Sequence, residues 1–127
     1  MALYEFLKSK LHGATVTQAH LDYQGSIGIP EDLMRAAKLR EYERVMVADL
    51  TSGNRLSTYV LRLEPGCGEI SMNGAAAHLI QKDNHIIVFS WTMLTEDEVK
   101  DHHPALVFLD AHNKIREIKT GEIHAPA

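Results

Sequence analysis

Three polar residues spaced two positions apart, Arg55, Ser57 and Tyr59, form the first candidate group for chemistry. In an extended strand, residues two apart point to the same face, so these side chains would form one row. Arginine offers a fork of hydrogen-bond donors to a carboxylate, and a tyrosine hydroxyl carries a transferable proton. The row fits the binding and protonation of an anionic substrate, and the alternative is a solvated polar face on an edge strand.

Two segments of small residues are further candidates. Gly25-Ser26-Ile27-Gly28 is not the Gly-x-Ser-x-Gly nucleophile motif of hydrolases, and alone it describes a turn into a strand. Asn73-Gly74-Ala75-Ala76 is small enough for a ligand to approach its backbone amides, which would stabilise an oxygen anion. The second segment also suits a helix start with tightly packed alanines, so neither segment specifies a site by itself.

Cationic and imidazole side chains complete the candidates. Lys8, Lys10 and His12 share one face if the chain is extended there, either as an anion-attracting group or as a solvent-facing stripe. The sequence has no cysteine pair and no His-Glu-x-x-His motif, and its histidines are scattered, so we predict no metal site. The eight histidines are His12, His20, His78, His85, His102, His103, His112 and His124.

Strands must position most of these candidates, and the sequence predicts a mainly β fold. Short segments rich in apolar and β-branched residues favour strands. Ser52-Gly53-Asn54 is a turn signal, so residues 44–63 are expected to form a hairpin whose second strand begins at Arg55. The predicted strands are 14–16, 44–50, 55–63, 85–94, 105–109 and 115–118.

Helices are expected to be few and short. One begins at Pro30, where proline and the following acids suit a first turn, and runs to about Leu39. Thr95 and Glu98 have the spacing of a capping box, and Ala75–Ala77 suggests a third, brief helix. Many short strands with a few single helices are typical of a small β-barrel.

The composition describes one soluble domain covering residues 1–127, with 45% hydrophobic and 24% charged residues and no repeat or linker. A formal net charge of -4 disfavours a nucleic-acid partner. No apolar stretch approaches the ~20 residues that span a membrane, and the N-terminus is not that of a signal peptide, so we expect a cytoplasmic protein. The single cysteine, Cys67, excludes an intramolecular disulfide.

Four segments, in this order, resemble the pyruvoyl-dependent aspartate 1-decarboxylases over nearly the whole chain. They are Lys10-Leu11-His12, Tyr23-Gln24-Gly25-Ser26, Gly53-Asn54-Arg55-Leu56-Ser57-Thr58-Tyr59 and Asn73-Gly74-Ala75-Ala76-Ala77-His78. The resemblance implies a double-psi β-barrel and a homotetramer with active sites between subunits. It also implies decarboxylation of L-aspartate to β-alanine and carbon dioxide, which feeds pantothenate biosynthesis.

By this resemblance the chain is a proenzyme that cuts itself between Gly25 and Ser26. The products would be residues 1–25, the β chain, and residues 26–127, the α chain. Ser26 Oγ would attack the Gly25 carbonyl, and Thr58 would donate a hydrogen bond to the resulting oxyanion. Elimination and hydrolysis would then release ammonia and leave a pyruvoyl group at residue 26.

The resemblance also implies roles in decarboxylation. The pyruvoyl group would form a Schiff base with the amine of aspartate. Arg55 would hold a substrate carboxylate, Lys10 would lend positive charge, and Tyr59 would be the proton donor. Residues expected to line the pocket are Asn73, Gly74, Ala75 and Ala76, and residues expected near the cleavage site are His12 and Tyr23.

Several questions stay open at this level. Simple alternation puts Thr58 on the strand face opposite Arg55 and Tyr59, which a shared intersubunit site or a β-bulge would reconcile. Three other readings are an uncleaved binding barrel, a nucleic-acid-binding barrel and a histidine metalloenzyme. Maturation alone and maturation with a helper protein are both compatible with the sequence. Departures from the commonest family pattern are Gln24, beside the scissile bond, and Ala48, Leu56 and Asp83-Asn84.

Overall fold

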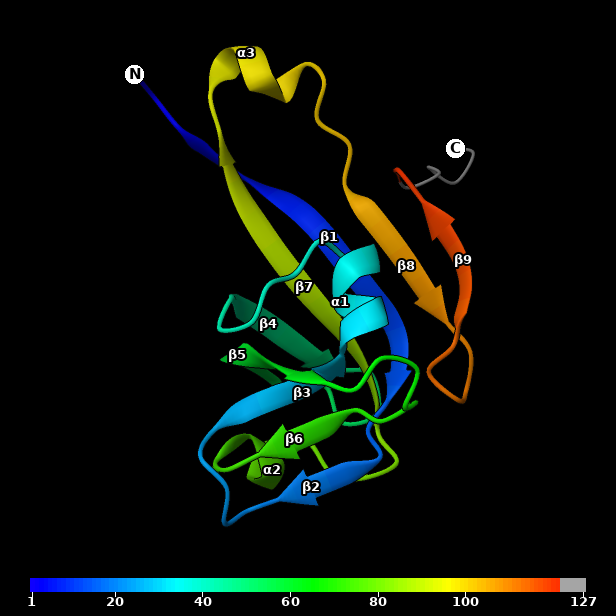
Figure 1. Cartoon of the computed structure of the whole chain (residues 1–127). Helices are drawn as coiled ribbons and strands as arrows, with labels where there is room; N and C mark the ends of the chain where they lie inside the picture. The colour runs from blue at the N-terminus through cyan, green and yellow to red at the C-terminus, as the bar shows by residue number, and fades with distance from the viewer. Residues whose placement is uncertain (122–127) are drawn as a thin grey trace.

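The computed structural model describes residues 1–121, and these residues are mostly β-structure (Figure 1). His124 and the C-terminal end of the expected domain lie outside the described residues. The strands are β1 (Tyr4–Thr15), β2 (Gln18–His20), β3 (Ser26–Pro30), β4 (Arg44–Asp49), β5 (Arg55–Leu63), β6 (Ser71–Asn73), β7 (His85–Leu94), β8 (Ala105–Leu109) and β9 (Ile115–Lys119). The helices are α1 (Glu31–Ala36), α2 (Ala76–Leu79) and α3 (Glu96–Val99).

Within residues 1–121 the strands form one nine-stranded sheet in the order β2-β6-β3-β5-β4-β7-β1-β8-β9. The long strands β1 and β7 are neighbours and run antiparallel, and α3 follows the end of β7 (Figure 1). Three neighbouring pairs are parallel: β1 with β8, β2 with β6 and β3 with β5. The predicted mainly β fold with short helices is confirmed, and this sheet is compatible with a double-psi β-barrel.

Strand β3 is buried along its whole length. All five residues of β3 are buried, and Ile27 and Ile29 are inaccessible to solvent. They pack with inward-facing residues of the other strands, among them Leu11, Val47 and Val60. Strand β3 is therefore fixed on both edges, by β5 on one side and β6 on the other.

The largest differences from the predicted strand and helix limits are at β1 and at the end of α1. The strand expected at 14–16 is only the end of β1, since polar residues along Tyr4–Thr15 hide the strand pattern in the sequence. The helix expected to reach about Leu39 ends at Ala36. Lys38 has a positive φ of 58°, and the Leu39 amide donates to the Met34 carbonyl at 2.8 Å, the ending of a Schellman motif.

None of the helices within residues 1–121 has the length and apolar character to cross a membrane.

A buried aspartate holds the turn that leads into β5. Asp49 is 2% exposed, and it accepts hydrogen bonds from Ser52 Oγ at 2.8 Å, Asn84 Nδ2 at 2.6 Å and the Thr51 amide at 2.8 Å. Burial by itself raises the pKa of Asp49, but these hydrogen bonds outweigh it and hold the pKa below its usual value. The ionised carboxylate therefore organises the loop before Arg55.

We expect Asp49→Ala to lower the free energy of unfolding by about 2 kcal/mol, since it leaves three donors without their acceptor. The stabilisation by Asp49 is full above about pH 4, the pKa of an unfolded aspartate, and is lost as the pH falls through the lowered folded pKa. Urea unfolding at neutral and acidic pH measures both effects. Asp101→Ala, at an exposed aspartate, is the control; an equal loss in both variants would contradict the role of Asp49.

Candidate active site

The Ser26 hydroxyl is buried and already hydrogen-bonded. Ser26 is inaccessible to solvent and begins β3, where it pairs with Asn73 across the antiparallel β3–β6 ladder. Asn73 Nδ2 donates to Ser26 Oγ at 2.8 Å. Asn73 is itself 5% exposed, and its buried Oδ1 has no hydrogen-bond partner within residues 1–121. The amide therefore orients the hydroxyl and keeps one acceptor available beside it.

Gly25 lies at the surface immediately before this buried serine, and Gly74 packs against it. Gly74 has a positive φ of 64°, and a Cβ added there would lie 2.7 Å from both the Gly25 nitrogen and the Tyr23 carbonyl oxygen. The Gly74 amide donates to the His20 carbonyl at 2.8 Å, on the strand that leads to the loop. Only glycine at residue 74 permits this close approach of the loop backbone.

Strand β5 brings Thr58 and Tyr59 to the same region. The parallel β3–β5 ladder pairs Ile27 with Val60, so Tyr59 lies on the strand next to Ser26. Thr58 and Tyr59 are both half-buried, and both line a cavity of about 340 Å³. Simple alternation still puts the Thr58 and Tyr59 side chains on opposite faces of β5, and both residues contribute to the lining of this cavity. Its lining is Gly25, Leu56, Ser57, Thr58, Tyr59, Ala75, Ala76 and Leu79.

Lys10 and His12 are not brought to this cavity within one chain. Across the sheet, Ser57 pairs with Met46, Met46 with Phe89 and Phe89 with Lys10. Three strand spacings therefore separate Ser57 from Lys10, about 14 Å. The Lys10 ammonium lies 5.7 Å from the Phe89 ring centroid, on β7. The predicted residues are thus divided: some line the cavity, Ser26, Asn73 and Gly74 lie next to Gly25 at its edge, and Lys10 and His12 lie on β1, while Arg55 is not part of the cavity lining.

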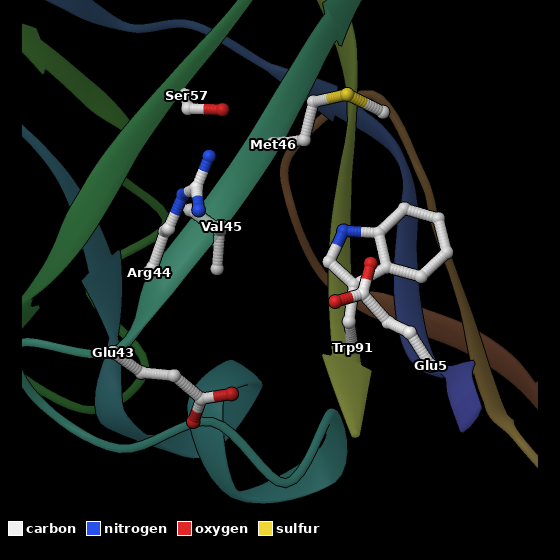
Figure 2. Close-up of a pocket in the computed structure, with 7 residues that line it drawn as sticks. All are labelled: Glu5, Glu43, Arg44, Val45, Met46, Ser57 and Trp91. Atoms are coloured by element: carbon white, nitrogen blue, oxygen red, sulfur yellow. The ribbon is translucent and has the colours of Figure 1, made fainter. Parts of the chain in front are cut away.

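A second cavity, of about 460 Å³, lies on the outer face of β1, β4, β5 and β7, and its lining includes neither Gly25 nor Ser26 (Figure 2). Figure 2 shows the Arg44 side chain extending along β4 toward Ser57. Arg44 pairs directly with Tyr59 in the β4–β5 ladder. Sequence reasoning did not single out Arg44, because the hairpin over residues 44–63 was predicted without the register that places Arg44 opposite Tyr59. Arg55, on the same face, is exposed.

Comparison with known proteins shows the family of the chain. A family model described as aspartate decarboxylase matches residues 2–116. The chain belongs to the aspartate decarboxylase family. It is 47% identical over 123 residues to the aspartate 1-decarboxylase of Caldicellulosiruptor saccharolyticus, covering 97% of this chain and 96% of that protein. It is 50% identical over 118 residues to the aspartate 1-decarboxylase of Acetivibrio thermocellus, covering 93% and 94%.

This member of the aspartate decarboxylase family shows no metal site in the part that the structure describes. No group of three or more histidine, cysteine, aspartate or glutamate side chains is placed to hold an ion in residues 1–121. In the adjacent pair His102-His103, the His102 Nε2 lies 2.7 Å from the Leu7 carbonyl oxygen, and its ring lies edge-on to Phe6 at 5.9 Å. His102 therefore has a packing role between the start of β1 and the loop before β8.

Proposed function

We propose that this protein cuts itself between Gly25 and Ser26 and then decarboxylates L-aspartate with a pyruvoyl group formed from Ser26. The observation that carries the proposal is the buried Ser26 hydroxyl, which accepts a hydrogen bond from Asn73 and directly follows the exposed residue Gly25. A cavity lined by Thr58 and Tyr59 opens at the same glycine. Membership of the aspartate decarboxylase family supplies the substrate.

The maturation chemistry uses residues that this site contains. Ser26 Oγ attacks the Gly25 carbonyl carbon, and the bond from that carbon to the Ser26 nitrogen breaks, which leaves an ester. Thr58 is the proposed donor to the oxyanion formed on the way. Loss of the Ser26 α-proton then breaks the Cβ–O bond and releases Gly25 as a carboxylate. Water adds to the remaining unsaturated residue, ammonia leaves, and a ketone stays at residue 26.

The residues around Ser26 fit a small ketone group. The alanines at 75 and 76 keep the cavity wall small, and Asn73 Nδ2, which donates to Ser26 Oγ at 2.8 Å, is a donor for a carbonyl oxygen at residue 26. The pyruvoyl group, once formed, supplies an electron sink through a Schiff base to the substrate amine. Arg55 is the proposed partner of a substrate carboxylate, and Tyr59 is the proposed proton donor to the carbon that loses carbon dioxide.

A second copy of the chain is proposed to complete the site. Lys10 and His12 lie three strands away from the cavity in one chain, so they reach a substrate only in a neighbouring copy. The same outer face exposes 41% of Trp91 and 51% of Met93, which a partner subunit would cover. We therefore propose a homotetramer with active sites between subunits, whose product β-alanine enters pantothenate biosynthesis.

The first test is an intact-mass spectrum of the purified protein under denaturing conditions. We expect two chains, 1–25 and 26–127, with the larger one lighter by one ammonia than a fragment that starts with serine. Borohydride in the presence of aspartate should add the substrate to the larger chain, and carbon dioxide release should require aspartate. A single full-length chain with no turnover would refute the proposal.

Gly74→Ala should slow self-cleavage about a hundredfold, since the new methyl group would displace the backbone of Tyr23 and Gly25. The fraction of uncut chain over time on a denaturing gel measures this effect. Gly53→Ala is the matched control: Gly53 has a similar positive φ of 82°, and nothing lies within 4 Å of the added Cβ. Equal slowing in both variants would assign the effect to backbone strain rather than to contact with the loop.

A further inference from the structure

A row of contacting side chains links β2 to the cleavage loop and has no role in the proposed chemistry. The His20 ring stacks on the Tyr23 ring, with centroids 4.5 Å apart and an interplanar angle of 21°. His20 Nε2 lies 2.6 Å from Gln18 Oε1, and Gln18 Nε2 donates to Glu69 Oε1 at 2.8 Å. These residues connect the loop before the scissile bond to the body of the fold.

The direction of these hydrogen bonds indicates which nitrogen of the His20 ring carries a proton. An ionised glutamate only accepts hydrogen bonds, so Glu69 requires the Gln18 amide nitrogen on its side. The Gln18 oxygen therefore faces His20, and His20 must carry a proton on Nε2. With its proton and orientation set in this way, the His20 ring offers one defined face to Tyr23.

His20 also joins the two backbone segments that enclose the scissile bond. Its carbonyl accepts the Tyr23 amide at 3.4 Å and the Gly74 amide at 2.8 Å. It pairs with Asn73 in the parallel β2–β6 ladder, and Asn73 in turn holds the Ser26 hydroxyl. A shift of His20 would therefore change both the loop and the wall that contacts it.

We infer that His20 is a positioning residue for self-cleavage. Gln18 and Glu69 orient the His20 ring, and this ring holds Tyr23. The loop is thereby kept in a position where Ser26 Oγ can reach the Gly25 carbonyl carbon. This inference rests on the proposed function. Tyr23 itself is 61% exposed, so little else in the fold of residues 1–121 restrains its ring. A loop held by such a stack keeps the reacting atoms close, and small displacements of reacting atoms slow a reaction strongly.

The first experiment measures the cleavage rate of freshly purified precursor for His20→Ala, His20→Phe and Gln18→Ala. We expect about a tenfold slowing in His20→Ala, which loses the stack and the hydrogen bond. His20→Phe keeps the stack and should slow cleavage only about threefold, a rescue that a purely polar role would not produce. Gln18→Ala should also slow it about threefold, and adding it to His20→Ala should have no further effect.

The matched control is His85→Ala, which removes another surface histidine, whose Nδ1 lies 3.2 Å from Thr15 Oγ1. It should cleave at the wild-type rate. Thermal unfolding of each variant shows whether the fold is kept. The inference is overturned if the wild type cleaves and His20→Ala cleaves equally fast. It is also overturned if His85→Ala slows cleavage as much as His20→Ala does.

The second experiment separates this inference from the proposed function. In the Ser26→Ala precursor, which has no nucleophile, amide hydrogen exchange reports the loop directly. Adding His20→Ala should raise exchange at Tyr23 and Gly74, and adding His85→Ala should not. Nitrogen NMR should show His20 protonated at Nε2. If the wild type never cleaves, the proposed function fails, and unchanged exchange at both amides would then overturn the role of His20 as well.

Discussion

Ser26→Ala should leave the chain entirely uncut and unable to release carbon dioxide from aspartate. The alanine has no oxygen to attack the Gly25 carbonyl, and no ketone can form at residue 26 without that attack. The chain should still fold: the change leaves the Asn73 amide without its acceptor, a loss of about 1–3 kcal/mol that a domain of this size tolerates. The expected mass spectrum therefore shows one full-length species.

The matched control for this variant is Ser71→Ala. Ser71 is another buried serine, 6% exposed, on the neighbouring strand β6, where it pairs with Gly28. It should be cut into the same two fragments as the wild type and should turn over aspartate. Fragments of 1–25 and 26–127 from Ser26→Ala would mean that another group breaks the bond, and would remove Ser26 from the mechanism.

Tyr59→Phe should separate maturation from turnover. Tyr59 is proposed to protonate the substrate carbon after carbon dioxide leaves, and loss of a positioned general acid slows such a step about 10²- to 10⁴-fold. Cleavage should proceed, since the oxyanion donor proposed for that step is Thr58. The measurement is carbon dioxide release divided by the amount of pyruvoyl chain found by mass spectrometry.

Tyr42→Phe is the matched control for the loss of a tyrosine hydroxyl. The Tyr42 and Tyr59 ring centroids are 6.2 Å apart, and Tyr42 is 71% exposed. Tyr42→Phe therefore removes a hydroxyl of the same kind from a neighbouring ring. We expect it to keep turnover within about twofold of the wild type. Full activity in Tyr59→Phe would assign proton donation to another group, and uncut Tyr59→Phe would place Tyr59 in maturation instead.

Local patterns determined much of the fold in advance. The strand periodicity of residues 55–63, the turn at Ser52-Gly53-Asn54 and the capping box at Thr95 all appear where the sequence predicted them. These features depend on neighbours within a few positions, so the chain encodes them locally. The three-residue strands β2 and β6 were not predicted, because so short a segment has no periodicity and forms only through its partners.

The sequence by itself determined which residue types the site contains and their family, since the four matching segments stand in order along the chain. Only the tertiary structure decided their arrangement. It placed Asn73 on Ser26, Gly74 against Gly25 and the ring of His20 on Tyr23, and it kept Lys10 three strands from the cavity. The physical reason is that sheet order and register are set by burial of the whole core, which no single segment contains.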